Sequence, residues 1–303
     1  MSEVSFPNGG LNMAGILHFP PGFDETKQYP AIACVHPGGG VKEQTAGLYA
    51  ARLAEEGFVA LAFDASGQGA SEGEPRLLEN PHARVEDARS AIDFLATRPF
   101  VDPDRVGILG VCAGGGYAVN AAMSDRRVKA VGAVSAVNIG DMFRRGWDGS
   151  GDIGQSLSLL EMGSAQRTLR AAGEDDDYLP FAPESLEGVE DTDMREAYDY
   201  YRTPRAQHCN APSKFPASSL VPLVTFDAFH LADIFLTQPL QLVAGSEAGS
   251  LWFSKDLFAK AAGAEKNLHI VEGGTHLALY DQPEAVDEAM SKLTPFYQRY
   301  LAA

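Results

Sequence analysis

The short stretch Gly110-Val111-Cys112-Ala113-Gly114 sets a thiol in the pattern Gly-x-Cys-x-Gly. In the related pattern Gly-x-Ser-x-Gly, the central side chain is a nucleophile on a sharp turn between a strand and a helix. An apolar run precedes Cys112 and a run of small residues follows it, so the sequence predicts that turn here. A helix N-terminus favours a thiolate, and the N–H of Ala113 would be free to hold an oxyanion. Cys112 is therefore the candidate nucleophile; the alternative is an inert, buried cysteine.

A glycine-rich segment, HPGGG at residues 36–40, follows another apolar run. Glycines let a backbone approach a reacting carbonyl, so such a loop can supply the second N–H that holds an oxyanion. We expect the N–H of Gly40 or of Val41 to be this donor. His36 opens the loop, and we expect it to be structural rather than a base. A plain turn is the alternative reading of the segment.

His276 is the candidate general base. It ends the segment EGGTH, residues 272–276, directly after the last predicted strand. The order along the chain, a nucleophile followed by a late histidine, is the order that this kind of elbow requires. A surface histidine without a catalytic role is the alternative.

The carboxylate that would orient the histidine is the least defined part of the predicted site. Glu247 is our first choice, because it is the only carboxylate in the turn that follows the predicted strand 240–244. Asp141 is the second choice, after the predicted strand 128–137, and Asp227 and Asp233 are weaker alternatives. A thiol ionises more easily than a hydroxyl, so a cysteine tolerates a weak or absent acid better than a serine does.

The elements that would position these residues alternate along the chain. Predicted strands cover residues 4–6, 11–19, 29–36, 58–64, 106–111, 128–137, 240–244 and 268–271, and predicted helices cover 45–56, 81–97, 113–123, 251–262 and 283–301. Strands that alternate with helices predict an α/β fold with a doubly wound, mostly parallel sheet. Residues 138–237, rich in Gly, Asp, Tyr and Pro, predict short helices at best. We expect them to form a cap, inserted between core segments 1–137 and 238–303, over the carboxyl ends of the strands.

Composition excludes several classes of function. The chain has 303 residues, 45% of them apolar, and a formal net charge of −17. Such a charge argues against partners such as nucleic acid or an anionic membrane. The N-terminal residues lack a signal-peptide pattern and no apolar run could span a bilayer, so we expect a cytoplasmic protein. Three widely spaced cysteines match neither a disulfide framework nor a zinc site, and we expect no metal and no cofactor.

Four segments carry a family resemblance: HPGGGVKEQTAGLYA, FDASGQGASEGEPR, GVCAGGGYA and EGGTHLALYD. The chain resembles the α/β-hydrolase superfamily over nearly its full length, and its cysteine elbow is similar to that of dienelactone hydrolases. The four segments together resemble bacterial hydrolases related to fungal polyketide transferases and thiohydrolases. The resemblance implies an α/β-hydrolase fold, a Cys112–His276 pair, an oxyanion loop at residues 38–41 and acyl transfer. The chain departs from the family pattern at the acid, because the turn Gly245–Ala248 contains no Asp.

A cysteine nucleophile narrows the substrate class. After attack on an ordinary ester, the intermediate expels the thiolate more readily than the alkoxide, so activated groups such as thioesters, enol lactones and aryl esters suit it better. We therefore expect an acyl hydrolase or acyltransferase that forms an acyl-cysteine on a small-molecule substrate, with acyl-carrier or CoA thioesters among the options. Aromatic residues of the cap would line an apolar acyl pocket. The alternative is a non-catalytic binding protein of the same fold. The sequence leaves the oligomeric state open, a homo-oligomer included.

Overall fold

The computed structural model describes residues 1–301, which form one eight-stranded sheet with helices on both faces. The strand order is β1-β2-β4-β3-β5-β6-β9-β10, and the six strands from β4 onward run parallel. β2 is antiparallel to both β1 and β4. The strands are β1 (Ser2–Asn8), β2 (Leu11–His18), β3 (Tyr29–Val35), β4 (Val59–Phe63), β5 (Val101–Val111), β6 (Val128–Val134), β9 (Leu240–Gly245) and β10 (Lys266–Val271). The predicted doubly wound, mostly parallel sheet is confirmed.

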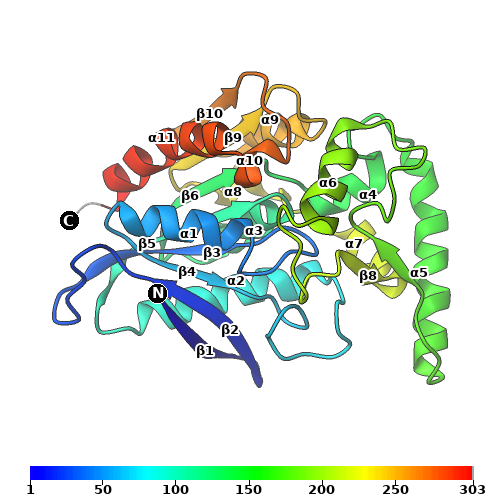
Figure 1. Ribbon diagram of the computed structural model, residues 1–303, viewed down its shortest axis with the longest axis horizontal. Coiled ribbons are helices and arrows are strands. Elements are labelled where there is room, and N and C mark those ends of the chain that lie inside the picture. The colour runs from blue at the N-terminus through cyan, green and yellow to red at the C-terminus, as the bar shows by residue number, and fades with distance from the viewer. Residues whose placement is uncertain (302–303) are drawn as a thin grey trace.

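Two apolar cores hold the helices against the sheet. Tyr49 of α1 and Leu293 of α11 belong to one core, whereas Val85 of α2, Tyr117 of α3 and Phe253 of α9 belong to the other. The helices outside the irregular middle of the chain are α1 (Thr45–Glu55), α2 (Pro81–Ala96), α3 (Ala113–Ser124), α9 (Leu251–Lys260), α10 (Ala278–Asp281) and α11 (Pro283–Tyr300). The sheet is therefore the middle layer of three (Figure 1).

Local sequence explains why these elements form. β4 reads VALAF and all five residues are buried, the pattern of a parallel strand covered on both faces. α2 begins at Pro81, which needs no N–H bond in the first turn, and the side chain of Asn80 caps it by accepting the N–H of His82 at 3.1 Å.

Residues 138–237, here called the insertion, separate β6 from β9. They contain α4 (Ile139–Arg145), η1 (Ile153–Gln155), α5 (Ser156–Ala171), β7 (Tyr178–Pro180), α6 (Thr192–Arg202), β8 (Lys214–Pro216), η2 (Ala217–Ser219), α7 (Leu220–Thr225) and α8 (Ala232–Phe235). β7 and β8 form a separate antiparallel pair. Figure 1 shows most of the insertion gathered at the right of the molecule, with α5 along its outer edge.

The prediction of short helices at best is wrong for this insertion, because α5 spans 16 residues and α6 spans 11. α5 buries few apolar side chains, and Leu157 and Met162 are exposed, so it lacks the apolar periodicity by which a helix is recognised. It packs through Gly163 instead, where an added Cβ would lie 3.0 Å from Cβ of Leu220. α6 does carry a start signal, since Asp191 caps it by accepting the N–H of Met194 at 2.9 Å.

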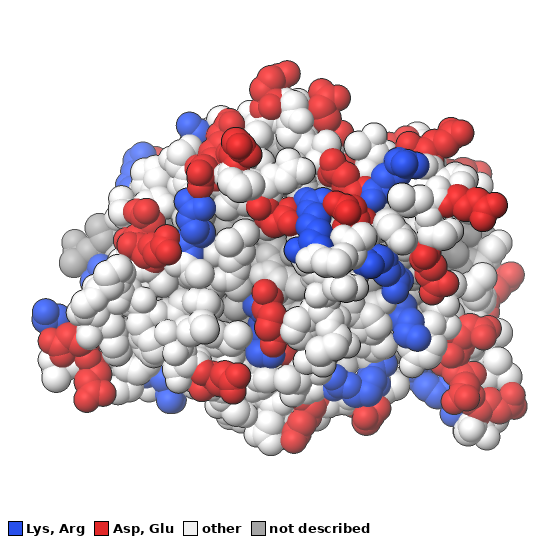
Figure 2. All heavy atoms as spheres, in the orientation of Figure 1, with Lys and Arg blue, Asp and Glu red and all other residues white. Residues whose placement is uncertain are grey.

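On the face of the molecule in Figure 2, Asp and Glu side chains are interspersed with Lys and Arg side chains, and the basic groups form no continuous patch there. None of the helices within residues 1–301 combines the length and the apolar character that a membrane crossing requires.

Candidate active site

Cys112 lies on the sharp turn between β5 and α3. Its φ of 57° and ψ of −125° are a strained conformation for a residue with a side chain. Gly114 is required two residues further on, because an added Cβ there would lie 2.3 Å from the carbonyl oxygen of Val35. An added Cβ on Gly110 would lie 2.1 Å from the carbonyl oxygen of Gly114. This is the geometry of the predicted elbow, which lifts the Cys112 side chain above the sheet edge.

Two backbone N–H groups lower the pKa of the Cys112 thiol by hydrogen bonding to its sulfur. One belongs to Ala113, the first residue of α3, and the other to Gly38, in the loop after β3. Both loops lie at the carboxyl edge of the parallel strands, where α/β sheets bind ligands. A carbonyl oxygen that becomes negative beside this sulfur would find two donors.

The structure corrects the predicted second donor. The N–H of Gly40 donates to the carbonyl oxygen of Pro37 at 3.2 Å, and the N–H of Val41 donates to Oε1 of Gln44 at 3.1 Å. Both groups are therefore occupied within their own turn. The loop closes on itself between residues 37 and 40, and in this loop it is the N–H of Gly38 that lowers the pKa of the Cys112 thiol.

His36 fixes the start of this loop. Its Nδ1–H donates to the carbonyl oxygen of Pro37 at 2.7 Å, and its Nε2 accepts the N–H of Ala65 at 3.1 Å. Arg84 donates to the carbonyl oxygen of His36 at 2.7 Å. Burial and the charge of Arg84 hold the pKa of His36 well below its ordinary value. His36 is thus a neutral structural group, as its position in the sequence suggested.

Two buried ion pairs support the same region. Arg84 and Glu79 pair at 3.0 Å, and the hydroxyl of Tyr117 donates to Glu79 at 2.6 Å. Lys42 and Asp64 pair at 2.7 Å, and both side chains are almost fully buried. Breaking a buried pair leaves an uncompensated charge, so these contacts hold the loops around Cys112 in one arrangement.

The hydroxyl of Tyr280 bridges His276 and Cys112. It lies 3.2 Å from Nε2 of His276 and also forms a hydrogen bond with the sulfur of Cys112. The predicted Cys112–His276 pair did not include this residue. Tyr280 lies four residues after His276, within α10. Side chains at that spacing can meet on one side of a helical turn, so this spacing is the signal that could have indicated Tyr280.

Ser250, rather than Glu247, meets the other ring nitrogen of His276. The Ser250 hydroxyl lies 2.5 Å from Nδ1 of His276. For Nε2 to accept from Tyr280, Nδ1 must carry the proton and donate to Ser250. Glu247 is exposed, and its carboxylate accepts from its neighbour Ser246, so the structure does not bring Glu247 to the histidine.

The other carboxylates considered from the sequence do not contact His276 either. Asp141 pairs with Arg144 on its own helix at 2.8 Å. Asp227 accepts from the side chain of Asn138 at 2.7 Å, and Asp233 is exposed.

Asp193 is the carboxylate that lies beside His276. It belongs to α6 of the insertion and is 3% exposed. Its carboxylate accepts the backbone N–H of His276 at 3.1 Å, the N–H of Gly249 at 2.8 Å and the indole N–H of Trp147 at 2.7 Å. Sequence reasoning missed it because it lies 83 residues before His276, in a segment without a catalytic motif.

Burial shifts the pKa values of both candidate catalytic groups. It raises the pKa of the Cys112 thiol to about 11, against the opposing effect of Tyr280 and the two N–H donors. It lowers the pKa of His276 to about 4, although the charge of Asp193 favours the protonated ring. At pH 7 the site therefore holds a neutral thiol and a neutral imidazole, so that a thiolate must form during reaction rather than before it.

A cavity of about 390 Å³ contains these groups. The insertion supplies most of its walls, which are apolar, and no Lys, Arg, Asp or Glu is among its lining residues: Gly38, Cys112, Ala113, Ile139, Met142, Phe143, Trp147, Leu179, Pro180, Phe181, Met194, Ala197, Tyr201, Phe215, His276, Leu277 and Tyr280. Within residues 1–301, no three His, Cys, Asp or Glu side chains are arranged to hold a metal ion. The cavity suits an uncharged, apolar group.

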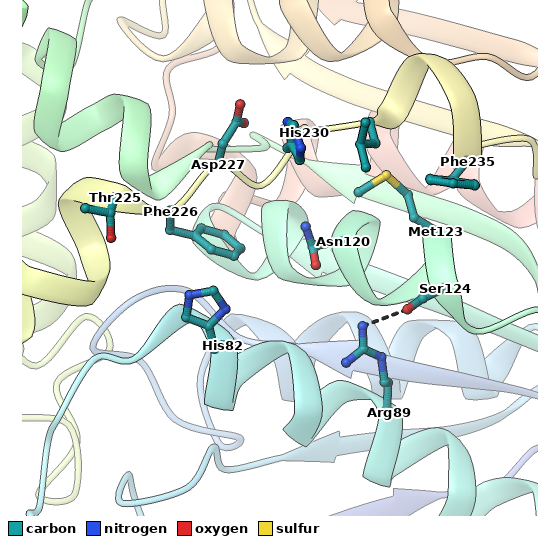
Figure 3. Close-up of a pocket in the computed structure, with 11 residues that line it drawn as sticks. His82, Arg89, Asn120, Met123, Ser124, Thr225, Phe226, Asp227, His230 and Phe235 are labelled. Carbon is teal, nitrogen blue, oxygen red and sulfur yellow. Dashed lines mark hydrogen bonds between the residues drawn. The ribbon is translucent and has the colours of Figure 1, made fainter.

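A larger cavity, of about 780 Å³, lies between α2, α3 and the segment that follows α7 (Figure 3). Its two histidines, His82 and His230, are exposed, and Arg89 donates to Ser124 at 2.7 Å. It contains none of the groups around Cys112, so we assign the chemistry to the smaller cavity.

The elbow, the late histidine and the mostly parallel eight-stranded sheet define an α/β hydrolase. The chain belongs to the dienelactone hydrolase family, whose model matches residues 14–136. It is 49% identical over 303 residues to the uncharacterized protein YcjY of Escherichia coli K12, with 99% of each chain covered.

Solved structures agree with this assignment. The crystal structure of the hypothetical protein PA2218 from Pseudomonas aeruginosa matches with a TM-score of 0.92 and 32% identity, covering 99% of this chain and 93% of that one. The α/β hydrolase GrgF from Penicillium matches with a TM-score of 0.82 and 22% identity, covering 100% of this chain and 99% of that one. In sequence, the polyketide transferase GrgF is 29% identical over 60% of this chain and 58% of its own. The resemblance stated from the sequence is confirmed.

Proposed function

We propose that the protein is an acyl hydrolase or acyltransferase that works through an acyl-cysteine at Cys112. One observation carries the proposal: Gly38 and Ala113 line the same cavity as Cys112, and their N–H groups both stabilise its thiolate. The same cavity holds a base, His276, and a hydroxyl, Tyr280, hydrogen-bonded to both base and thiol. An inert cysteine needs none of these partners.

The first half-reaction forms the acyl-enzyme. The Cys112 thiol gives its proton to the Tyr280 hydroxyl, which passes its own proton to Nε2 of His276, so tyrosine stays neutral. The thiolate attacks the carbonyl carbon, and the N–H groups of Ala113 and Gly38 hold the negative oxygen; one such donor is worth about 3 kcal/mol of barrier. The intermediate then expels the leaving group, which takes the proton from His276.

The second half-reaction releases the acyl group. Neutral His276 accepts a proton from water or an alcohol, whose oxygen attacks the acyl-cysteine carbonyl. The same two N–H groups hold the second oxyanion. Collapse breaks the carbon–sulfur bond, and the proton on His276 returns to the sulfur through Tyr280.

The apolar cavity supports an uncharged acyl chain of medium size. Thioesters, including those of acyl carriers and CoA, are the activated donors that fit a cysteine nucleophile. The name of one relative, polyketide transferase GrgF, supports acyl groups of polyketide type.

A non-catalytic binding protein is the second candidate, favoured by one observation. Burial raises the pKa of the Cys112 thiol to about 11, as expected for an unreactive cysteine. Such a protein would bind an apolar ligand in the same cavity and leave it unchanged.

Turnover of matched variants distinguishes the two candidates. We expect Cys112→Ala to abolish hydrolysis of acyl thioesters and aryl esters, whereas Cys209→Ala, which removes an exposed thiol, retains it. Release of free thiol or phenol is the measurement. Full activity of Cys112→Ala would contradict a cysteine mechanism, and a wild-type protein that binds the panel without turnover would favour the binding protein.

A further inference from the structure

Asp193 carries a buried negative charge without a cationic partner. Its three hydrogen-bond donors are N–H groups of Trp147, Gly249 and His276, and none of the ion pairs formed within residues 1–301 includes it. Burying a carboxylate costs several kcal/mol unless an opposite charge or hydrogen bonds compensate. Asp193 accepts the backbone N–H of His276, and its charge favours the protonated form of that residue's imidazole.

Titratable groups from three elements surround the imidazole. The titratable groups that face it are Asp193 from α6, Tyr280 from α10 and, through Tyr280, Cys112 from the elbow. Ser250 contacts Nδ1 as a neutral hydroxyl. The turn after β9, where the family pattern places the acid, thus supplies a hydroxyl in its place.

The same helix also forms part of the acyl cavity. Met194, Ala197 and Tyr201 of α6 line the cavity that contains Cys112. Glu196, on the same helix, accepts the hydroxyl of Thr275 at 2.6 Å, beside His276. One helix of the insertion therefore contacts both the acyl chain and the base.

We propose that Asp193 is the positioning residue that stabilises the protonated form of His276, and that α6 thereby links occupation of the acyl cavity to the reactivity of Cys112. This inference rests on the proposed acyl transfer at Cys112. The proton leaves the Cys112 thiol through Tyr280 and reaches Nε2 of His276, and the Asp193 carboxylate stabilises the resulting charge without taking the proton. An acyl chain that packs against α6 holds this carboxylate in place.

Asp193→Asn tests the proposal, with Asp199→Asn as the matched control. Both remove one negative charge from α6, but Asp199 is exposed and pairs with Arg205 instead. We expect Asp193→Asn to slow acylation of Cys112 by decanoyl thioester at least tenfold, with KM nearly unchanged, and Asp199→Asn to stay within twofold. Rates are divided by the amount of folded protein, since a merely structural role would lower that amount and leave the rate per folded molecule unchanged.

A second variant distinguishes loss of the carboxylate from misfolding of the Asp193→Asn protein. In Asp193→Ala, formate should accelerate acylation and chloride should not, because only a carboxylate fills the vacated position. Alkylation of Cys112 by iodoacetamide, read in the same variants, does not depend on acyl transfer, so failure of the proposed function and failure of this inference are separate results. A wild-type rate in Asp193→Asn, no rescue by formate, or failure of both variants to fold would overturn the inference.

Discussion

At the scale of single residues, the hydroxyl of Tyr280 decides how a proton leaves Cys112. It is hydrogen-bonded to both the sulfur and Nε2 of His276, and its bond lowers the pKa of the thiol against the larger effect of burial. Tyr280→Phe would keep the ring and remove the relay. We expect kcat/KM to fall about 100-fold, the lower end of the range for acid–base catalysis.

The same substitution would raise the pKa of the Cys112 thiol further, because a donor to the thiolate is lost. Alkylation of Cys112 at pH 8 should therefore slow in Tyr280→Phe. Tyr300→Phe is the control, since it removes an exposed hydroxyl bonded to Glu265. Equal alkylation and turnover rates in the two variants would show that the thiol and the imidazole exchange the proton directly.

At the scale of elements, the small sheet of β7 and β8 forms one wall of the acyl cavity. Phe181, directly after β7, packs on Phe215 with ring centroids 4.5 Å apart and faces the glycine loop at Gly38. Phe181→Ala should enlarge the cavity and shift the preferred acyl chain to greater length. Tyr178→Ala is the control, because Tyr178 lies three residues earlier, on β7, and is exposed. Measurement of kcat/KM against chain length would refute this role for Phe181 if both profiles match the wild type.

The elements also show what a sequence can reveal of this site. Cys112 and His276 were predictable because each lies in a local pattern beside a predicted strand. Gly38 was not, because the N–H that reaches the sulfur depends on how the turn closes. Asp193 and Ser250 were not, because α6 meets His276 only through the tertiary fold. The sheet was predictable since its buried strands are continuous apolar runs, whereas α5 has too few buried apolar residues to produce a helical pattern.

At the scale of the whole molecule, buried neutral histidines link stability to pH. Burial lowers the pKa of His276 to about 4 and that of His36 well below its ordinary value. The unfolded chain binds protons at these histidines near pH 6.5 while the folded chain does not, so the free energy of unfolding should fall as the pH decreases below 6.5.

For His276 alone, the free energy of unfolding should decrease by an amount on the order of 3 kcal/mol between pH 7.5 and pH 4. Urea unfolding of wild type and His276→Gln across this range measures it, and the variant should show the smaller decrease. His82→Gln is the control, because His82 is exposed. A wild-type pH dependence identical to that of His276→Gln would contradict the neutral, buried imidazole.

The most direct test of the central claim is the mass of the intact protein after mixing with a panel of acyl thioesters and quenching in acid within seconds. We predict an acyl adduct on Cys112, located by peptide mapping, that accumulates and then decays as product forms. Turnover in the absence of any adduct, or an adduct on another residue, would contradict acyl transfer through Cys112.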